Sequence, residues 1–507
     1  MGFSESSYYK SYKTLRNRFR KYDAERLVVD LLRFANERPF SVENLNRRPW
    51  LCVLVVKWIL LDDYYQERHR PIAGKRDFDR ILGDAAALEN AARMPNEFDS
   101  IRLFLRTIAH QQFPYQRGLF SSDFARQFVL FGRLQGNHRL SVAFEEKFGI
   151  PVRRFLLLSI ATLPLLVKDE PTPVSTGWFA SLYKGVSDEE IGRFLAAISV
   201  TLDEGRDFML SLDDRKRPSS EFYEQSPFIR KPLLRMPTGY WPIHLALLHR
   251  GLENFVYDNL RAVDPQGFMD SFSKIFENYV GTVVRAAPGD VYTERELIKA
   301  RKQRGKVVDF AIFCADSIVL VDAKAVSGTH ESQTASSARA LRDRTKSGAL
   351  KAVEQALGLL LDLDAGHLAL PRERGSNEEF RALIVVTARE MHLGNGVSFS
   401  EAVGHDELEK IYAKYQGNDR LPKEHIYFMS IEAFEHLMGA VSQNETSLRK
   451  AIERARDDDA VPSSAKFDFN QHLATQGLAF ELPAAIEQEL DMALHELEGM
   501  LEQGASE

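Results

Sequence analysis

Three charged residues in two apolar segments have the types and spacing that phosphodiester hydrolysis requires. The run Val321-Asp322-Ala323-Lys324-Ala325 predicts a strand, and strand alternation places Asp322 and Lys324 on one face. Asp309 lies 13 residues before Asp322, in another strand-like run, Val307 to Phe313. Adjacent strands would bring both carboxylates within reach of one cation. Two carboxylates can hold Mg²⁺, which stabilises charge on a phosphate, and a lysine can orient or deprotonate the attacking water.

Two further polar residues extend this constellation. Glu277 belongs to a helix predicted from about Met269 to Val284, where it would complete the acidic set or hold a second metal. The alternative for Glu277 is a solvated helix face. Gln355 belongs to a second predicted helix, from about Thr345 to Leu361, and would hydrogen-bond the site from there.

In chain order, Glu277, Asp309, Asp322-Ala323-Lys324 and Gln355 on a predicted αβββαβ core resemble the PD-(D/E)XK nuclease superfamily, the restriction-endonuclease-like fold. The resemblance covers roughly residues 255 to 390. It implies a metal-dependent nuclease acting on DNA, with Mg²⁺ as cofactor and Mn²⁺ as its substitute. Asp309, Asp322 and Glu277 would be the metal ligands, and Lys324 and Gln355 would complete the catalytic set. Val308 stands where the family name has Pro, and residue 322 is Asp rather than Glu.

The triplet that carries the resemblance is weak without its context. Glu145-Glu146-Lys147 and Asp214-Arg215-Lys216 match the same expression, but neither lies in a predicted strand. Asp322 and Lys324 instead interrupt a strand that would otherwise bury both faces. Burying a lone charge costs several kcal/mol unless the charge is paired or metal-bound. This cost favours a functional site over a structural Asp-Lys pair.

Basic residues lie on both sides of the acidic motif in sequence. The segment Lys299 to Lys306 contains five basic residues in eight and no acid. Such charge would contact phosphates without reading base sequence, and its alternative is a solvated hairpin tip. Glu294 and Glu296, in the first predicted strand, are interpreted as exposed acids. The residues predicted to bind nucleic acid are Arg301, Lys302, Arg304, Lys306, Arg344 and Lys346.

The elements that must position these residues divide the chain into three regions. Residues 1–250 are predicted to be mostly helical and to serve recognition, regulation or partner docking. Residues 255–445 form the predicted nuclease-like α/β domain, and residues 453–507 a linker followed by an acidic helix from Ala484 to Leu501. The predicted strands of the core are Val291 to Ile298, Val307 to Phe313, Ile318 to Ala325 and Ala382 to Ala388.

A basic and aromatic segment begins the helical region. Residues 8–22 alternate six Lys or Arg residues with Tyr and Phe. Nucleic-acid binding is one interpretation of this pattern, and a basic helix face with buried aromatic residues is the commoner one.

Length and composition exclude several classes of protein. The chain has 507 residues, 44% hydrophobic and 27% charged, which is ordinary for globular domains. Its two cysteines, Cys52 and Cys314, exclude a disulfide scaffold and a four-thiolate zinc site. The apolar runs Trp50 to Leu61 and Phe155 to Val167 are shorter than the roughly 20 residues of a bilayer crossing. We therefore expect a cytoplasmic protein without a membrane partner, since the first residues also lack a signal-type apolar core.

The charge distribution leaves nucleic acid open as a partner. Residues 481–507 contain eight acids and no Lys or Arg. The whole chain has a net charge of -6, so the rest of the chain has a net charge of +2. The sequence lacks the phosphate-binding motif Gly-x-x-x-x-Gly-Lys-Ser/Thr, which argues against an ATPase motor, and it lacks the Gly-x-Ser-x-Gly nucleophile elbow.

Two rivals to the nuclease hypothesis stay open. One is a catalytically silent nuclease fold that acts as a nucleic-acid-binding or assembly scaffold. The other makes the helical half a protein-interaction platform. Double-strand cleavage would need two sites and therefore a homodimer. Large bacterial proteins that combine helical regions with such a core resemble anti-phage defence effectors, which is an analogy of architecture.

Overall fold

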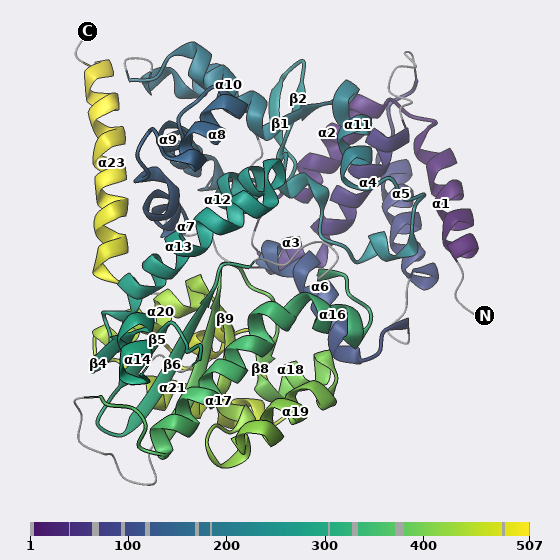
Figure 1. Ribbon diagram of the computed structural model, residues 1–507. Helices are drawn as coiled ribbons and strands as arrows, with labels where there is room; N and C mark the ends of the chain where they lie inside the picture. Colours follow the sequence, from purple (N-terminus) through teal and green to yellow (C-terminus); the bar gives the residue numbers. More distant parts are fainter. Residues whose placement is uncertain are drawn as a thin grey trace. The chain divides into compact units, whose positions relative to one another are not determined.

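The computed structural model describes residues 5–39, 41–62, 70–92, 97–116, 122–167, 172–182, 185–302, 305–326, 333–370, 380–478 and 482–505. The chain forms two compact units (Figure 1). Unit 1 comprises Met1–Glu97, Thr107–Pro265 and Glu489–Glu507, and unit 2 comprises Phe98–Arg106 and Gln266–Gln488. The sequence analysis set residues 453–507 apart as a third region, whereas the structure assigns their first part to unit 2 and their last part to unit 1.

Unit 1 is mostly helical, as the periodicity of residues 1–250 predicts. A small sheet, β1 Ser199–Thr201, β2 Leu233–Met236 and β3 Gly239–Pro242, interrupts the helices in the order β1-β2-β3. The turn between β2 and β3 falls at Pro237-Thr238. The principal helices are α1 Glu5–Phe19, α2 Ala24–Ala35, α4 Pro49–Asp62, α5 Lys75–Ala87, α8 Arg139–Phe148, α9 Val152–Ile160, α10 Asp188–Ile198, α11 Leu202–Leu212 and α12 Leu245–Val263.

Helix α4 lies in the centre of unit 1 because it is apolar on every side. Its residues from Leu51 to Leu61 are all buried, including Lys57. Among the described residues no single helix is long and apolar enough to cross a membrane. One pair of helices, Arg139–Phe148 and Val152–Leu165, meets those criteria only when taken together, and it bends by 66° at its break.

The basic and aromatic segment at the start of the chain forms α1, with its aromatic residues turned inward. Tyr8, Tyr12 and Phe19 are buried. The basic residues pair with acids of the same unit: Arg18 Nε lies 2.5 Å from Asp84, and Arg20 Nε lies 2.5 Å from Asp62. These contacts agree with a helix face that packs on the rest of unit 1.

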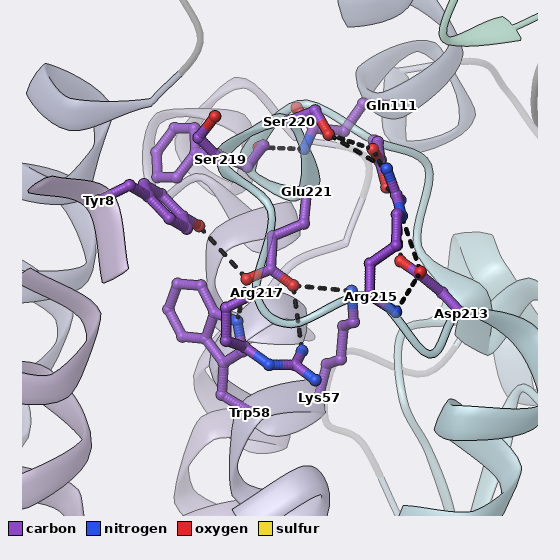
Figure 2. A network of polar contacts seen from close by, with 12 residues as sticks. Tyr8, Lys57, Trp58, Gln111, Asp213, Arg215, Arg217, Ser219, Ser220 and Glu221 are labelled. Atoms are coloured by element: carbon purple, nitrogen blue, oxygen red, sulfur yellow. Dashed lines mark hydrogen bonds and ion pairs between the residues drawn. The ribbon is translucent and has the colours of Figure 1, made fainter. Parts of the chain in front are cut away.

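One buried carboxylate organises the polar core of unit 1. Glu221 is almost completely buried, and its oxygens accept from Lys57 Nζ and Trp58 Nε1, each at 3.0 Å (Figure 2). Arg217 Nη1 donates to the same carboxylate at 3.2 Å and Tyr8 Oη at 3.4 Å. Two cations and two neutral donors from α1, α4 and the segment before Glu221 therefore satisfy one buried anion.

Unit 2 is built on a six-stranded mixed sheet with the order β4-β5-β6-β7-β9-β8. The first three strands are antiparallel, and β6, β7 and β9 are parallel to one another. Phe310 pairs with Val321, and Lys324 pairs with Thr387. The strands are β4 Asp290–Thr293, β5 Phe310–Phe313, β6 Ser317–Lys324, β7 Phe380–Thr387, β8 Gly394–Asn395 and β9 Ile426–Ser430.

Helices pack on both faces of this sheet. On one face, α13 Pro265–Val284 lies so close to β5 that a side chain at Gly281 would collide with the Phe310 ring. The other face carries Ala311, Leu320 and Val385 and packs on α17 Lys351–Asp364. The remaining helices are α16 Ala338–Thr345, α18 Gly396–Val403, α19 His405–Tyr415, α20 Ile431–Ser442, α21 Leu448–Asp459 and α22 Phe469–Thr475.

The element order agrees with an α/β fold and differs from the predicted core at three places. The first predicted strand, Val291 to Ile298, is strand only to Thr293 and continues as α14 Glu294–Ala300. The Thr293 and Glu296 side chains form a capping box that begins this helix, which overrides the β-like alternation of the segment. Strand β5 begins at Phe310, three residues later than predicted. The predicted linker, residues 453–466, begins as the second half of α21.

The acidic helix predicted near the end of the chain is α23 Ala484–Ala505. Its acids are not only solvated. Within unit 1, Glu489 pairs with Arg133, and Arg153 Nη2 lies 2.6 Å from Glu496. The basic partners on α9 and before α8 explain why a tail with eight acids packs on the protein.

Replacing the central carboxylate of unit 1 should destabilise that unit. Glu221→Gln leaves Lys57 and Arg217 buried without their counter-charge, so we expect the free energy of unfolding to fall by roughly 3–5 kcal/mol. All four tryptophans, at positions 50, 58, 178 and 241, belong to unit 1, so urea denaturation followed by tryptophan fluorescence reports on this unit. The exposed Glu146→Gln is the control, and an equal midpoint for both variants would contradict the role given to Glu221.

Candidate functional site

Strand pairing in unit 2 places the two aspartates of the motif opposite each other. Phe310 pairs with Val321 in the antiparallel register of β5 and β6, and continuing this register by one residue sets Asp309 beside Asp322. Asp309 Oδ2 accepts a hydrogen bond of 2.7 Å from the backbone N–H of Ala323. This bond fixes the Asp309 carboxylate at the end of β6.

Asp322 is a buried charge that the protein compensates only in part. The residue has no exposed surface, and Lys324 Nζ lies 2.5 Å from its Oδ2. Neither Asp322 oxygen has a hydrogen-bond partner of good geometry among the residues that the structure describes. Most buried carboxylates have their lone pairs satisfied, so these oxygens are suitable ligands for a hard cation.

Burial and mutual repulsion disfavour two negative charges at this place. Burial, together with the nearby Asp322 carboxylate, raises the pKa of Asp309 to about 7, although Lys324 opposes the change. Burial likewise raises the pKa of Asp322, against the opposing effect of Lys324. A divalent cation between the two carboxylates would remove both penalties, because the positive charge favours their ionised forms. The donor set therefore fits Mg²⁺ or Mn²⁺.

Glu277 faces the same region from α13. Its side chain is 29% exposed, and its Oε1 accepts from Lys274 Nζ at 2.9 Å. Glu277 and Asp309 line one cavity of about 380 Å³. The structure thus brings Glu277 to the cavity that Asp309 lines, as a partly solvated acid that carries an ion pair of its own.

Gln355 contacts the backbone that leads to the site and not the carboxylates. Its Nε2 donates to the carbonyl oxygen of Val307 at 2.6 Å. Val307 is two residues before Asp309, so this bond ties the approach to β5 to helix α17. Its Oε1 is buried without a hydrogen-bond partner among the described residues, so the bond to Val307 uses only one end of the amide. The predicted place of Gln355 in the catalytic set stays a prediction.

The basic residues predicted to bind nucleic acid separate into two groups. Arg301 is 13% exposed and turns inward, where it pairs with Asp362 and donates to the carbonyl oxygens of Lys306 at 2.8 Å and Gly358 at 3.2 Å. Its guanidinium already bonds to three groups of the protein, and the predicted phosphate contact of Arg301 stays a prediction. Arg304 lies outside the described residues. The exposed members of the set are Lys302, Lys306, Arg344 and Lys346.

Sequence reasoning missed several residues around the cavity. Lys274, Arg285 and Arg295 line it together with Glu277 and Asp309. Glu294, predicted as an exposed strand acid, lines the same cavity from the first turn of α14. The signal was available on α13: the cavity-lining residues of this helix, Lys274, Glu277, Asn278, Gly281 and Thr282, recur at helical spacing, and Arg285 follows directly after the helix. Arg295 carries no such signal because its segment alternates like a strand.

A second group of potential metal ligands lies in unit 1. Asp123, His249 and Glu253 are buried with their ligand atoms within 4.8 Å of one another. Arg250 Nη1 lies 2.9 Å from Asp123 and 2.8 Å from Glu253, and Arg126 lies 3.5 Å from Glu253. Burial lowers the pKa of His249 and favours its neutral form. Two guanidiniums already balance two carboxylates, so this group is a neutral ionic network and a poor metal site.

Comparisons with known proteins do not assign the chain to a family. Neither a family model, nor a curated protein, nor a solved structure matches it.

Removing the Asp309 charge should stabilise the metal-free protein above about pH 4, with the full effect above about pH 7. Because the folded pKa of this acid is raised from 3.8 to about 7, native stability falls as pH rises between these values, by up to about 4 kcal/mol. In EDTA, Asp309→Asn should match the wild type near pH 4 and exceed its stability at pH 8, as measured by urea denaturation and circular dichroism. The exposed Asp290→Asn is the control. A variant no more stable than the wild type at pH 8 would contradict the raised pKa.

Proposed function

We propose that unit 2 is a metal-dependent phosphodiesterase that cuts DNA. The observation that carries this proposal is the Asp322 carboxylate, which is fully buried, lies beside Asp309 and Lys324, and keeps unsatisfied lone pairs. A protein that needed only structural stability would gain by replacing this group with apolar side chains. The choice of DNA over RNA comes from the resemblance to the PD-(D/E)XK superfamily.

Each residue of the site has a role that its position allows. Asp309 and Asp322 would hold Mg²⁺ or Mn²⁺, which supplies charge stabilisation at the phosphate and a more acidic bound water. Lys324, held by Asp322 with a side chain 17% exposed, can reach solvent and would orient the attacking water. Glu277 would assist from the cavity wall. Because its side chain is partly exposed, it could leave its ion pair with Lys274 and bind a metal ion instead.

The surroundings of the site fit a phosphate-bearing substrate. Lys274, Arg285 and Arg295 contribute three positive charges to the cavity, and Glu277, Glu294 and Asp309 contribute up to three negative ones. Without a cation the cavity is close to neutral, and with a divalent cation it becomes positive. Metal loading would therefore strengthen the attraction for the nucleic-acid backbone, which carries no base-specific information.

Cleavage should depend on the motif and on a divalent metal. Purified full-length protein, incubated with plasmid, linear duplex, single-stranded DNA or RNA, should cut at least one substrate in Mg²⁺ or Mn²⁺ and none in EDTA. Asp322→Asn and Lys324→Ala should lower the rate by roughly 100-fold or more, because each removes a group that acts in the reaction.

The matched controls are Asp214→Asn and Lys216→Ala, which change the same residue types in a triplet outside any strand. Circular dichroism should show that all four variants fold. Cleavage that persists in Asp322→Asn would contradict the proposed site, and a wild type that binds but never cuts would favour the silent scaffold.

Metal binding can be measured without a substrate. Calorimetric titration with Mn²⁺ should show saturable binding to the wild type near pH 8, where the Asp309 carboxyl is ionised. Asp309→Ala should weaken this binding at least 10-fold. A Glu253→Gln variant should leave it unchanged, because the unit 1 network is already balanced by arginines. Loss of binding in Glu253→Gln alone would place the metal in unit 1.

A further inference from the structure

Two lysines that are far apart in sequence are held together beside the aspartate pair. Lys351 begins α17, and Gln355 lies one helical turn later on the same face. The hydrogen bond from Gln355 Nε2 to the carbonyl oxygen of Val307 brings the segment before β5 against this turn. Lys306, the neighbour of Val307, is thereby placed next to Lys351.

A second contact fixes Lys306 from its other side. Arg301 Nη1 donates to the carbonyl oxygen of Lys306 at 2.8 Å, while the same guanidinium bonds to Gly358 and Asp362 of α17. The backbone around Lys306 is therefore anchored to α17 both through Arg301 and through Gln355. These two bonds fix the backbone position from which the exposed Lys306 side chain extends.

The result is a concentration of positive charge that the protein does not neutralise. The neighbouring Lys306 ammonium lowers the pKa of Lys351 through its close approach and its like charge, and the Lys324 charge adds to this effect. Among the described residues, neither Lys306 nor Lys351 forms an ion pair with an acid. The Asp322 charge opposes the lowered pKa of Lys351, but Lys324 already contacts that carboxylate. Like charges held close without a counter-ion are destabilising, so this arrangement requires another purpose.

We propose that Lys306 and Lys351 form a phosphate seat beside Asp322 and Lys324, which holds a backbone phosphate adjacent to the one that is cut. This inference deepens the proposed nuclease function and rests on it for the identity of the bound strand. Gln355 and Arg301 are positioning residues of the seat, since each acts on the backbone at Lys306 or Val307. The seat recognises the phosphate charge and carries no base specificity, because an ammonium is a point charge that binds any phosphate oxygen.

The seat can be tested by nucleic-acid binding in EDTA, where the proposed reaction does not proceed. Fluorescence anisotropy of labelled single-stranded and duplex DNA with the full chain gives the affinity over a range of salt concentrations. Lys306→Gln and Lys351→Gln should each weaken binding about 3- to 10-fold and reduce the slope of log affinity against log salt by about 0.7 to 0.9, the value for one lost phosphate contact.

Conservative and positioning variants separate a phosphate contact from a general loss of structure. Lys351→Arg should keep most of the affinity, and Gln355→Ala should lose part of the salt slope although it changes no charge. The exposed Lys450→Gln, also in unit 2, is the matched control and should bind like the wild type. Because Lys351→Gln removes a repulsion, its melting temperature should be equal to or above that of the wild type.

The outcomes distinguish this seat from the nuclease proposal. Binding by Lys306→Gln and Lys351→Gln that equals the Lys450→Gln control overturns the seat, even if the wild type cuts DNA. Weakened binding in a protein that cuts no substrate supports the seat and removes the nuclease. Inorganic phosphate is the second probe: if it stabilises the wild type but not Lys351→Gln, while DNA affinity is the same in both, the seat binds free anions and the assignment to a nucleic-acid strand is overturned.

Discussion

The burial of the Asp322 charge is the constraint on which the candidate site depends. A carboxylate inside β6 has lost its hydration, and only Lys324, two residues along the same strand, compensates it directly. The antiparallel register then adds a second acid, Asp309, opposite the first. Each carboxyl resists ionisation, and the pKa of Asp309 rises to about 7. Retaining a proton or binding a cation would relieve this repulsion, and the proposed hydrolysis uses the second of these states.

The two units contain buried charges of different character. In unit 1, Glu221 has Lys57 and Arg217, and Asp123 and Glu253 have Arg126 and Arg250. In these networks each buried acid already has basic partners, so the charges are balanced within the protein and leave no excess charge to bind a ligand. In unit 2 the charges stay unbalanced on both sides of the motif: acids exceed cations at Asp309 and Asp322, and cations exceed acids at Lys306 and Lys351. In the proposed function, the excess of negative charge would bind a metal ion and the excess of positive charge a phosphate.

Several polar residues near the motif act through the backbone. Arg301 and Gln355 both use their side chains to hold the segment that leads into β5. These bonds add to the pairing of β5 and to the contact of Asp309 with the N–H of Ala323. The site is thus maintained by groups that do not touch a substrate, which is how a carboxylate pair on the rim of a sheet can be kept in fixed geometry.

The sequence by itself determined the chemistry of the motif and the strand that carries it, because an acid and a lysine two residues apart in an apolar run can only share one face of a strand. It also indicated the flanking helices α13 and α17 through their apolar periodicity. Only the tertiary structure decided which polar side chains lie near the aspartate pair and which bond to other parts of the protein. Arg301 and Lys306 are both basic residues of one segment. The Arg301 side chain turns inward and bonds to Asp362 and two carbonyl oxygens, whereas the Lys306 side chain stays exposed. The segment of α14 alternated like a strand, and its capping box made it a helix. Such choices depend on partners tens of residues away, which local spacing does not encode.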